Sequence, residues 1–355
     1  MELDTNSWGE TTMMVFTEKR LDIRRSTLAS HFASAAIGAT DITAAQPFSV
    51  ATSDAAQEAL RLRDELDAVR RDHAKLSQAI YEAAQIQRKL CAPREMSWGK
   101  FEIAGEIFPV RHLSGDFFKV MELGSALGVV LGDIAGKGMT AGIWQAHLMG
   151  LIQRSARHHS NPGEAIAEVN RELCGDEGVP PLTALFFARI ESRTNELVYC
   201  NAGLPAPLLL RDNKSLERLD EGGPMLGAVK NGAFQTGRVT LNPGDLLVAY
   251  SDGVTECRNA EDQEFEMDRL TAATKAVSGI SANKALFSLL GTVLDFADSC
   301  SPNDDLTVLV VRCLDALNKK QSRRHTKDFS APERRTTSTA KSRSKHSGRG
   351  GQSSR

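Results

Sequence analysis

The sequence predicts an α+β domain of mainly antiparallel strands, preceded by one long helix. Three observations support this prediction. Residues 55–90 contain no Gly or Pro and carry apolar residues at heptad spacing. Short β-patterned runs follow, and two pairs of helical blocks interrupt them. Strand and helix do not alternate strictly, which disfavours a parallel sheet built from βαβ units.

The composition excludes several classes of protein. Of the 355 residues, 41% are hydrophobic and 25% are charged, which is ordinary for a folded domain. No apolar stretch approaches the roughly 18 residues of a membrane helix, and the first residues lack the features of a signal peptide. The six cysteines show no CxxC spacing, which disfavours a disulfide scaffold or a structural zinc site. We therefore expect a cytoplasmic protein without a membrane span.

The N-terminal third divides into two parts. Residues 1–53 show no sustained hydrophobic period, and we assign them no structure. In residues 54–95 apolar positions recur at alternating spacings of four and three, which is a heptad seam. We interpret this segment as a dimerisation helix that makes a homodimer, with polar His73 and Gln87 setting its register. The alternative is a helix packed on its own domain. A regulatory protein could act at the N-terminal segment.

Residues 97–314 form the main domain. The strand-like runs are rich in Val, Ile, Leu and Phe; they are FEIAGEIF, FFKVMEL, ALGVVLGDI, LTALFFARIES, ELVYCN, PLLLR, DLLVAYSD and LTVLVVRC. The helical blocks cover residues 139–157, 163–174, 266–278 and 282–298. Paired helices beside this many strands predict a single layered domain.

The C-terminal segment differs in charge from everything before it. Residues 318–355 contain 12 Lys or Arg and 2 acids, a net charge of +10, so the preceding residues must carry −12 to reach the total of −2. With almost no apolar residues, we expect this tail to be disordered. Its charge is suited to attract nucleic acid, anionic lipid or the acidic body of its own protein, and a solvated tail without a dedicated partner is an equally good interpretation.

Aspartates recur where predicted strands meet turns. Asp116, Asp133, Asp252 and the doublet Asp304–Asp305 all occupy such corners. One acid of this kind usually serves only the turn. Several that converge would raise one another's pKa unless a divalent cation neutralised them. Oxygen-only sites suit Mg²⁺ or Mn²⁺, and two such ions can activate water for attack on phosphorus. We therefore predict a phosphate-ester hydrolase.

Six motifs in a fixed order make this prediction specific. They are Gly-Asp-Phe-Phe (115–118), Gly-Asp-Ile-Ala-Gly-Lys-Gly-Met (132–139), Asn-Ala-Gly (201–203), Gly-Gly-Pro-Met-Leu-Gly (222–227), Tyr-Ser-Asp-Gly-Val-Thr-Glu (250–256) and Asp-Asp-Leu-Thr (304–307). This series resembles the PPM (PP2C-type) serine phosphatases of the bacterial SpoIIE and RsbU class. The resemblance implies a PP2C-like layered α/β/β/α sandwich.

The resemblance also implies roles for individual residues. The implied metal ligands are Asp116, Asp133, the backbone carbonyl of Ile134, Asp252 and either Asp304 or Asp305. Asp133 would bridge two Mn²⁺ or Mg²⁺ ions, and Asp133 and Asp116 are the expected catalytic residues. The implied activity is that of a protein serine/threonine phosphatase, in which metal-activated water attacks a phosphoserine. The implied substrate is a signalling phosphoprotein such as an anti-sigma factor antagonist.

Several residues depart from the family pattern. Ser114 and Lys119 stand where the family usually has a glycine and an acid, and Leu204 stands where it often has a histidine. Ala135 lies near the position of a histidine in eukaryotic members. Lys137 does not fit a P-loop and is interpreted as a turn residue. Lys119 and Leu204 motivate an alternative hypothesis, a catalytically weak or inactive scaffold of the same fold that binds phosphoproteins.

Overall fold

The computed structural model describes residues 51–91, 94–110, 112–175 and 179–315. The chain divides into two compact units, residues 1–72 and 73–355. Most of the unassigned N-terminal segment and the whole basic tail lie outside the described residues. Where the chain is described, it contains no helix with the length and apolar character needed to cross a bilayer.

The long helix predicted from the heptad spacing is present. Helix α2 runs from Ala51 to Leu90. In the first unit its seam residues are exposed, with Leu62 at 56% and Val69 at 65%. In the second unit its last turns are buried at Ala84 and Gln87. The end of the seam is therefore used for contacts within the chain, and dimerisation through the rest stays a prediction.

Among the described residues, two six-stranded sheets form the centre of the second unit. One sheet has the order β1 (Glu95–Trp98), β2 (Phe101–Phe108), β12 (Leu306–Cys313), β11 (Leu246–Tyr250), β7 (Leu208–Leu210) and β8 (Leu216–Arg218). The other has the order β10 (Gly237–Thr240), β6 (Glu196–Ala202), β5 (Thr183–Glu191), β4 (Ala126–Ile134) and β3 (Asp116–Leu123), with β9 (Gly222–Gly223) beside β6. Only the β6–β9 pairing is parallel among the described strands.

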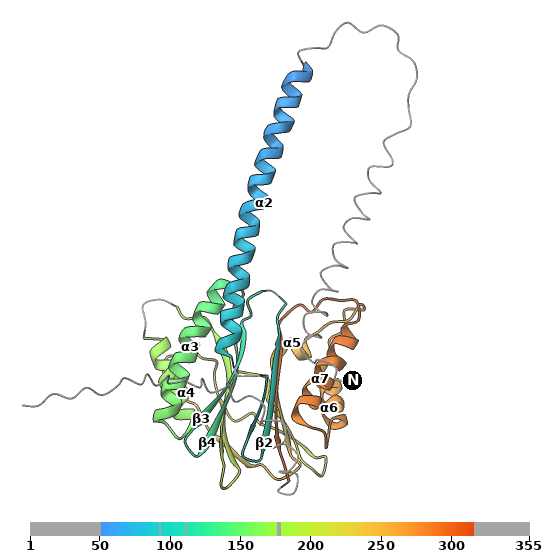
Figure 1. Cartoon of the computed structure of the whole chain (residues 1–355). Helices are drawn as coiled ribbons and strands as arrows, with labels where there is room; N and C mark the ends of the chain where they lie inside the picture. Colours follow the sequence, from blue (N-terminus) through green and yellow to red (C-terminus); the bar gives the residue numbers. More distant parts are fainter. Residues whose placement is uncertain (1–50, 92–93, 111, 176–178, 316–355) are drawn as a thin grey trace, which may run out of the picture. The chain divides into compact units, whose positions relative to one another are not determined.

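Helical pairs cover the outer faces of the two sheets (Figure 1). The pair α3 (Met139–His158) and α4 (Pro162–Leu173) lies on the sheet that contains β3 and β4. The pair α6 (Glu266–Ala276) and α7 (Ala282–Ala297) lies on the sheet that contains β2 and β12. A short helix, α5 (Asp252–Thr255), follows β11. Helix α4 starts where the Asn161 side chain accepts from two backbone N–H groups, which is a normal N-cap.

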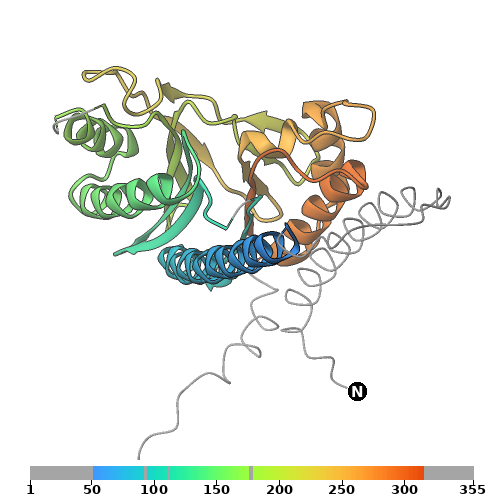
Figure 2. The same cartoon turned by 90° about the horizontal axis from the view of Figure 1, so that it is seen from above.

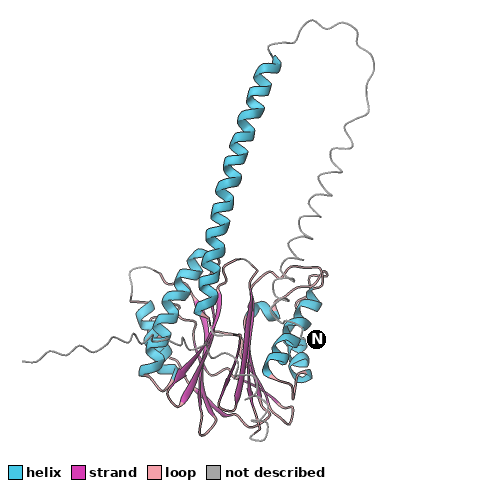
Figure 3. Ribbon diagram, in the orientation of Figure 1, coloured by secondary structure: helices cyan, strands magenta, loops and turns pink. Residues whose placement is uncertain are grey.

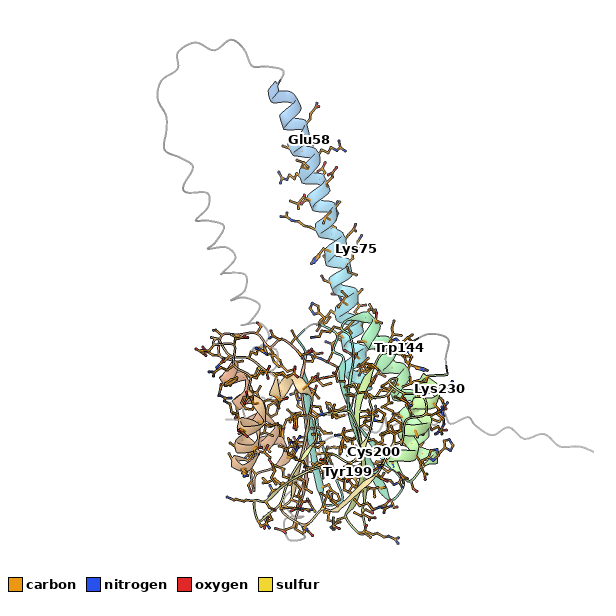
Figure 4. All side chains as sticks on the ribbon, turned by 180° about the vertical axis from the view of Figure 1, so that it is seen from behind. Glu58, Lys75, Trp144, Tyr199, Cys200 and Lys230 are labelled. Carbon is orange, nitrogen blue, oxygen red and sulfur yellow. The ribbon has the colours of Figure 1, made fainter. Side chains whose placement is uncertain are left out.

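Three hydrophobic clusters of described residues lie between these four layers. Figure 2 shows the layers from above, and Figure 3 shows them coloured by secondary structure. One cluster fills the space between the sheets, and the other two lie between each sheet and its helices. Neighbouring strand residues serve different clusters, because side chains alternate along a strand. Tyr199 of β6 belongs to the central cluster and Cys200 to the one under α3 and α4 (Figure 4).

The predicted layered sandwich of mainly antiparallel sheets is confirmed, including both helical pairs. The elements that the sequence did not predict are short: β1, β8, β9, β10 and α5 contain two to four residues each. Such segments are too brief to show a hydrophobic period. The strands β1, β9 and β10 form because the longer strands β2 and β6 offer them backbone partners.

Candidate active site

Asp116 and Asp133 lie opposite each other in one sheet. Asp116 begins β3, Asp133 lies next to the end of β4, and the two are direct cross-strand partners. Asp116 is buried, with 3% of its surface exposed, and Asp133 is half-buried. Like charges directly opposite one another destabilise a sheet. This pair therefore needs a compensating charge or a proton.

Gly115 allows the turn before β3 to approach the end of β4 closely. A Cβ atom at this position would lie 2.8 Å from the backbone oxygen of Ile134 and 3.1 Å from Asp133 Oδ1. The N–H of Ile134 also donates to the carbonyl of Gly115 at 3.2 Å. Glycine therefore keeps open a small space onto which oxygens of Asp133 and Ile134 both face.

Asp252 and the doublet Asp304–Asp305 occupy the end of the other sheet. Strand β11 ends at Tyr250 and β12 begins at Leu306, and the two strands run antiparallel, so their flanking residues are neighbours. A Cβ at Gly253 would lie 2.2 Å from the backbone oxygen of Asp305. Only glycine permits this approach, which brings the Asp252 turn against the doublet.

A hydrogen-bond network connects the two sheets at this end. Thr307, in β12, is fully buried, and its hydroxyl donates to Asp116 Oδ2 at 2.5 Å. The backbone N–H of Thr307 donates to Ser251 Oγ at 3.0 Å, and the N–H of Ser251 donates to the Thr307 carbonyl at 3.0 Å. Asp116 of one sheet is thereby held close to the residue that precedes Asp252 in the other.

The electrostatics of these acids show that they form one cluster. Burial, and then the charge of Asp133, raises the pKa of Asp116 well above its usual value, although Thr307 and Ser251 hydroxyls oppose the shift. Burial, and then the charges of Asp252 and Asp304, raises the pKa of Asp133 to about 6. The repulsion is largely uncompensated, which is a feature of functional sites.

The described residues contain no group of three or more His, Cys, Asp or Glu side chains close enough together to hold a metal ion in this arrangement. The acids interact through their charges, but their carboxylates do not converge on one point. Like-charged carboxylates are expected to turn away from one another. A cation would therefore have to draw them together by rotation of their side chains.

The two members of the Asp304–Asp305 doublet have different environments. Asp305 is buried and accepts from the N–H of Val110 at 2.8 Å, the hydroxyl of Ser114 at 2.7 Å and the N–H of Gly115 at 3.1 Å. These bonds hold the loop that leads to Asp116. The side chain of Asp304 is 48% exposed, and its charge raises the pKa of Asp133 more than the charge of Asp305 does. Of the two, Asp304 is therefore the better candidate ligand.

The last turn of α2 contacts this same loop. Gln87 donates to the Ser114 carbonyl at 2.8 Å and accepts from the Ser114 N–H at 3.1 Å. It also donates to Gln145 of α3. Ser114 Oγ in turn accepts from the N–H of Asp116 at 3.0 Å. Helix α2 is thus connected to the candidate metal ligand Asp116 through a single residue, Ser114.

The residues that depart from the family pattern have contacts of their own. Lys119 donates to the carbonyl of Leu90 at 2.5 Å, which ties β3 to the end of α2. Leu204 is buried in the cluster between the sheets, and Asn201 holds its backbone from both sides. Ser114 links Asp305 to Asp116, as described above.

Sequence reasoning missed four contributors to the site: Ser251, Thr307, Glu256 and Lys137. Ser251 and Thr307 lie inside the motifs at residues 250–256 and 304–307, so their place in these motifs was the signal that could have identified them. Burial, and then Asp252, raises the pKa of Glu256, which places it beside the cluster. Lys137 was interpreted as a turn residue, but its Nζ lies 2.7 Å from Asp304 Oδ1.

Comparison with known proteins agrees with this arrangement. The family model described as Stage II sporulation protein E (SpoIIE) matches residues 124–314. Protein IcfG of Synechocystis sp. is 26% identical over 245 residues, which cover 60% of this chain and 38% of that protein. Phosphoserine phosphatase RsbU of Bacillus subtilis is 22% identical over 231 residues, which cover 65% of this chain and 68% of RsbU. The chain thus spans well under half the length of IcfG.

Solved structures show the same fold. The SiaA-PP2C domain of Pseudomonas aeruginosa superposes with a TM-score of 0.60 at 16% identity, covering 68% of this chain and 98% of that one. The PP2C phosphatase domain of SpoIIE from Bacillus subtilis, solved with a fragment of its regulatory domain, gives a TM-score of 0.52 at 20% identity, covering 60% and 63%. Because the family model covers more than half of the chain, this protein belongs to the SpoIIE family, and its second unit has the PP2C-type phosphatase fold.

Proposed function

We propose that this chain is a metal-dependent phosphoserine phosphatase. The observation that carries the proposal is the meeting of acidic strand ends from both sheets, where Asp116 and Asp133 have raised pKa values because of burial and neighbouring carboxylates. Such a cluster offers a stable place for divalent cations. A structural role alone would not require carboxylates that repel one another.

The donor set fits hard divalent cations. It consists of carboxylates and the carbonyl of Ile134, and oxygen donors of this kind suit Mn²⁺ or Mg²⁺. The residues that we propose to hold two ions are Asp116, Asp133, Ile134, Asp252 and Asp304. We propose that Asp305 is not a ligand and supports the loop before Asp116. When bound, such ions supply Lewis acidity and lower the pKa of water at neutral pH.

We infer the substrate from the relatives. The chain is similar to RsbU, which is named a phosphoserine phosphatase, so phosphoserine on a signalling protein is the proposed substrate. An anti-sigma factor antagonist is the proposed kind of protein. The half-buried positions of Asp133, Asp252 and Asp304 support a site that a protein-borne phosphate can reach.

The main test is the replacement Asp252→Asn. It removes one charge from the cluster and should lower Mn²⁺-dependent kcat/KM for a phosphoserine peptide by about 10³-fold, or about 4 kcal/mol. Asp212→Asn is the matched control, because Asp212 is exposed and lies beside the start of β11, whereas Asp252 follows its end. Equal activity of the Asp252 variant and the wild type would reject the metal mechanism.

We further propose that α2 dimerises the chain and passes a regulatory signal to the site. The exposed seam at Leu62, Leu66 and Val69 and the Gln87 contacts with Ser114 support this. The full-length protein should sediment as a dimer at micromolar concentration, and a Leu66→Glu/Val69→Glu variant should sediment as a monomer. A monomeric wild type would contradict the heptad interpretation.

The alternative of a non-hydrolysing scaffold receives no support from a particular contact. It was motivated by Lys119 and Leu204, and both residues have structural roles. Lys119 donates to the carbonyl of Leu90 at the end of α2, and Leu204 is buried in the cluster between the sheets. Calorimetric titration with Mn²⁺ separates the two hypotheses, since the scaffold predicts no binding.

A further inference from the structure

We propose that Lys137 binds the phosphoryl group of the substrate. This inference deepens the proposed function and depends on it. Lys137 lies in the turn that follows Asp133 and Ile134 and precedes α3. Its position on the chain places an ammonium group beside the acidic cluster.

The cluster has an excess of negative charge, and a phosphate monoester is itself an anion. Among the ion pairs formed by described residues, the one between Lys137 and Asp304 is the only pair that includes any of the five aspartates. A phosphoryl group that approaches this cluster needs cationic donors. Lys137 is the side chain in place to supply one.

The hydrogen bonds of Lys137 leave donor capacity for a ligand. An ammonium carries three N–H donors. Two are accounted for by Asp304 Oδ1 at 2.7 Å and the Asn303 carbonyl at 3.3 Å. The Lys137 side chain is 32% exposed, so the third donor can reach a phosphate oxygen from solvent.

The same contacts orient Asp304 without using both of its oxygens. Oδ1 accepts from Lys137 and also from the N–H of Asp305 at 2.8 Å. Oδ2 takes no part in either bond. Asp304 can therefore serve the metal centre through one oxygen while Lys137 remains against the other. This arrangement fixes the ammonium at the edge of the site.

The test compares inorganic phosphate binding in full-length variants loaded with Mn²⁺. Lys137→Met keeps the length of the side chain and removes the charge, and it should weaken phosphate binding in calorimetry by about 10- to 100-fold, as expected for a charge-assisted hydrogen bond. KM for a phosphoserine peptide should rise with it. Lys137→Arg should restore most of the affinity, because it keeps the charge.

The control is Lys284→Met. Lys284 is an exposed residue of α7, and its neighbours Ala282 and Asn283 contact Glu102 and Glu95 at the other end of the sheet. This variant should bind phosphate as the wild type does.

Two results would overturn the inference. If the phosphate affinity of Lys137→Met equals that of the wild type, Lys137 has only a structural role, in which it connects its own turn to the loop of Asn303 and Asp304. Alternatively, Mn²⁺ affinity of the variant could change as much as phosphate affinity, which would mean that Lys137 acts on the metal centre. Failure of the proposed function is distinguishable, because then the wild type itself neither binds Mn²⁺ nor hydrolyses phosphoserine, and both proposals fall.

Discussion

Two buried aspartates, one beside each sheet, have opposite surroundings. Asp245, just before β11, is 2% exposed, and Asp116, at the start of β3, is 3% exposed. Asp245 accepts from Arg211 at 2.8 Å and from the backbone N–H groups of Asn242 at 2.9 Å and Asp212 at 3.1 Å. Asp116 faces the carboxylate of Asp133 and has a strongly raised pKa.

The comparison shows how a structural carboxylate differs from a functional one. Burial of a charge is tolerated when a partner and hydrogen bonds compensate for it. Asp245 has both, so it stabilises the chain around the start of β11. Among the described residues, no cationic side chain acts on Asp116 or Asp133, and Lys137 pairs only with Asp304 at the edge of the cluster. The repulsion between Asp116 and Asp133 is therefore relieved by protons or by bound ions. An unbalanced buried charge is thus the physical mark of the site.

The largest effect on stability should come from breaking the ion pair between Asp245 and Arg211. Asp245→Asn removes the buried partner of Arg211 and leaves only the pair with the more exposed Glu217. This change should lower the free energy of unfolding by about 3 kcal/mol. Urea denaturation measures this loss. The specific activity of the folded variant should match that of the wild type, because Asp245 and Asp252 flank opposite ends of β11. A large drop in activity without loss of stability would erase the distinction.

The next largest effect is the pH dependence of stability that comes from Asp133. Folding raises the pKa of Asp133 from 3.8 to about 6, so the folded protein binds a proton more tightly than the unfolded chain. In the presence of a chelator, the contribution of Asp133 to stability is therefore greatest below pH 4 and is lost as the pH rises through 6. Asp133→Asn removes this dependence, and its stability should exceed that of the wild type by on the order of 2 kcal/mol at pH 7.

Urea denaturation at a series of pH values in EDTA tests this prediction. Asp212→Asn is the reference variant, since an exposed carboxylate should leave the profile unchanged. Parallel profiles for Asp133→Asn and the wild type would mean that repulsion is absent from the cluster.

The smallest effect should come from the hydrogen bond between the sheets. Thr307→Val keeps the shape of the side chain and removes the donor to Asp116 Oδ2. Loss of a group that orients a ligand typically weakens metal binding by at least about tenfold. Calorimetry with Mn²⁺ should show this loss, and Thr307→Ser should recover most of the affinity. An unchanged Mn²⁺ affinity in the valine variant would show that Asp116 needs no orientation from β12.

Much of the architecture could be predicted from local patterns. The two helical pairs and the long strands have clear hydrophobic periods, and all of them formed close to the expected bounds. The acidic corners were also visible, because Asp and Gly at a strand end form a recognisable turn signal. The short strands β8, β9 and β10 were missed, because segments of two to four residues show no hydrophobic period. In addition, β9 and β10 depend on pairing with β6, which lies well before them in the sequence.

The role of each residue in the Asp304–Asp305 doublet could not be predicted, since adjacent residues of the same type carry no local distinction. Gln87 illustrates the same limit. Its heptad position suggested a seam between two copies, whereas its side chain bonds to Ser114 within the chain. Lys137 was interpreted as a turn residue for want of any local signal that Asp304 lies beside it.

The sequence by itself determined which segments become strands and helices and which acids end up at strand termini, because periodicity and turn preferences act over a few neighbouring residues. Only the tertiary structure decided which carboxylates meet, which one of the doublet supports the Ser114 loop, and which cation stands beside them. Those outcomes depend on the packing of one sheet against the other, and packing joins residues that are nearly two hundred positions apart, as Asp116 and Thr307 are.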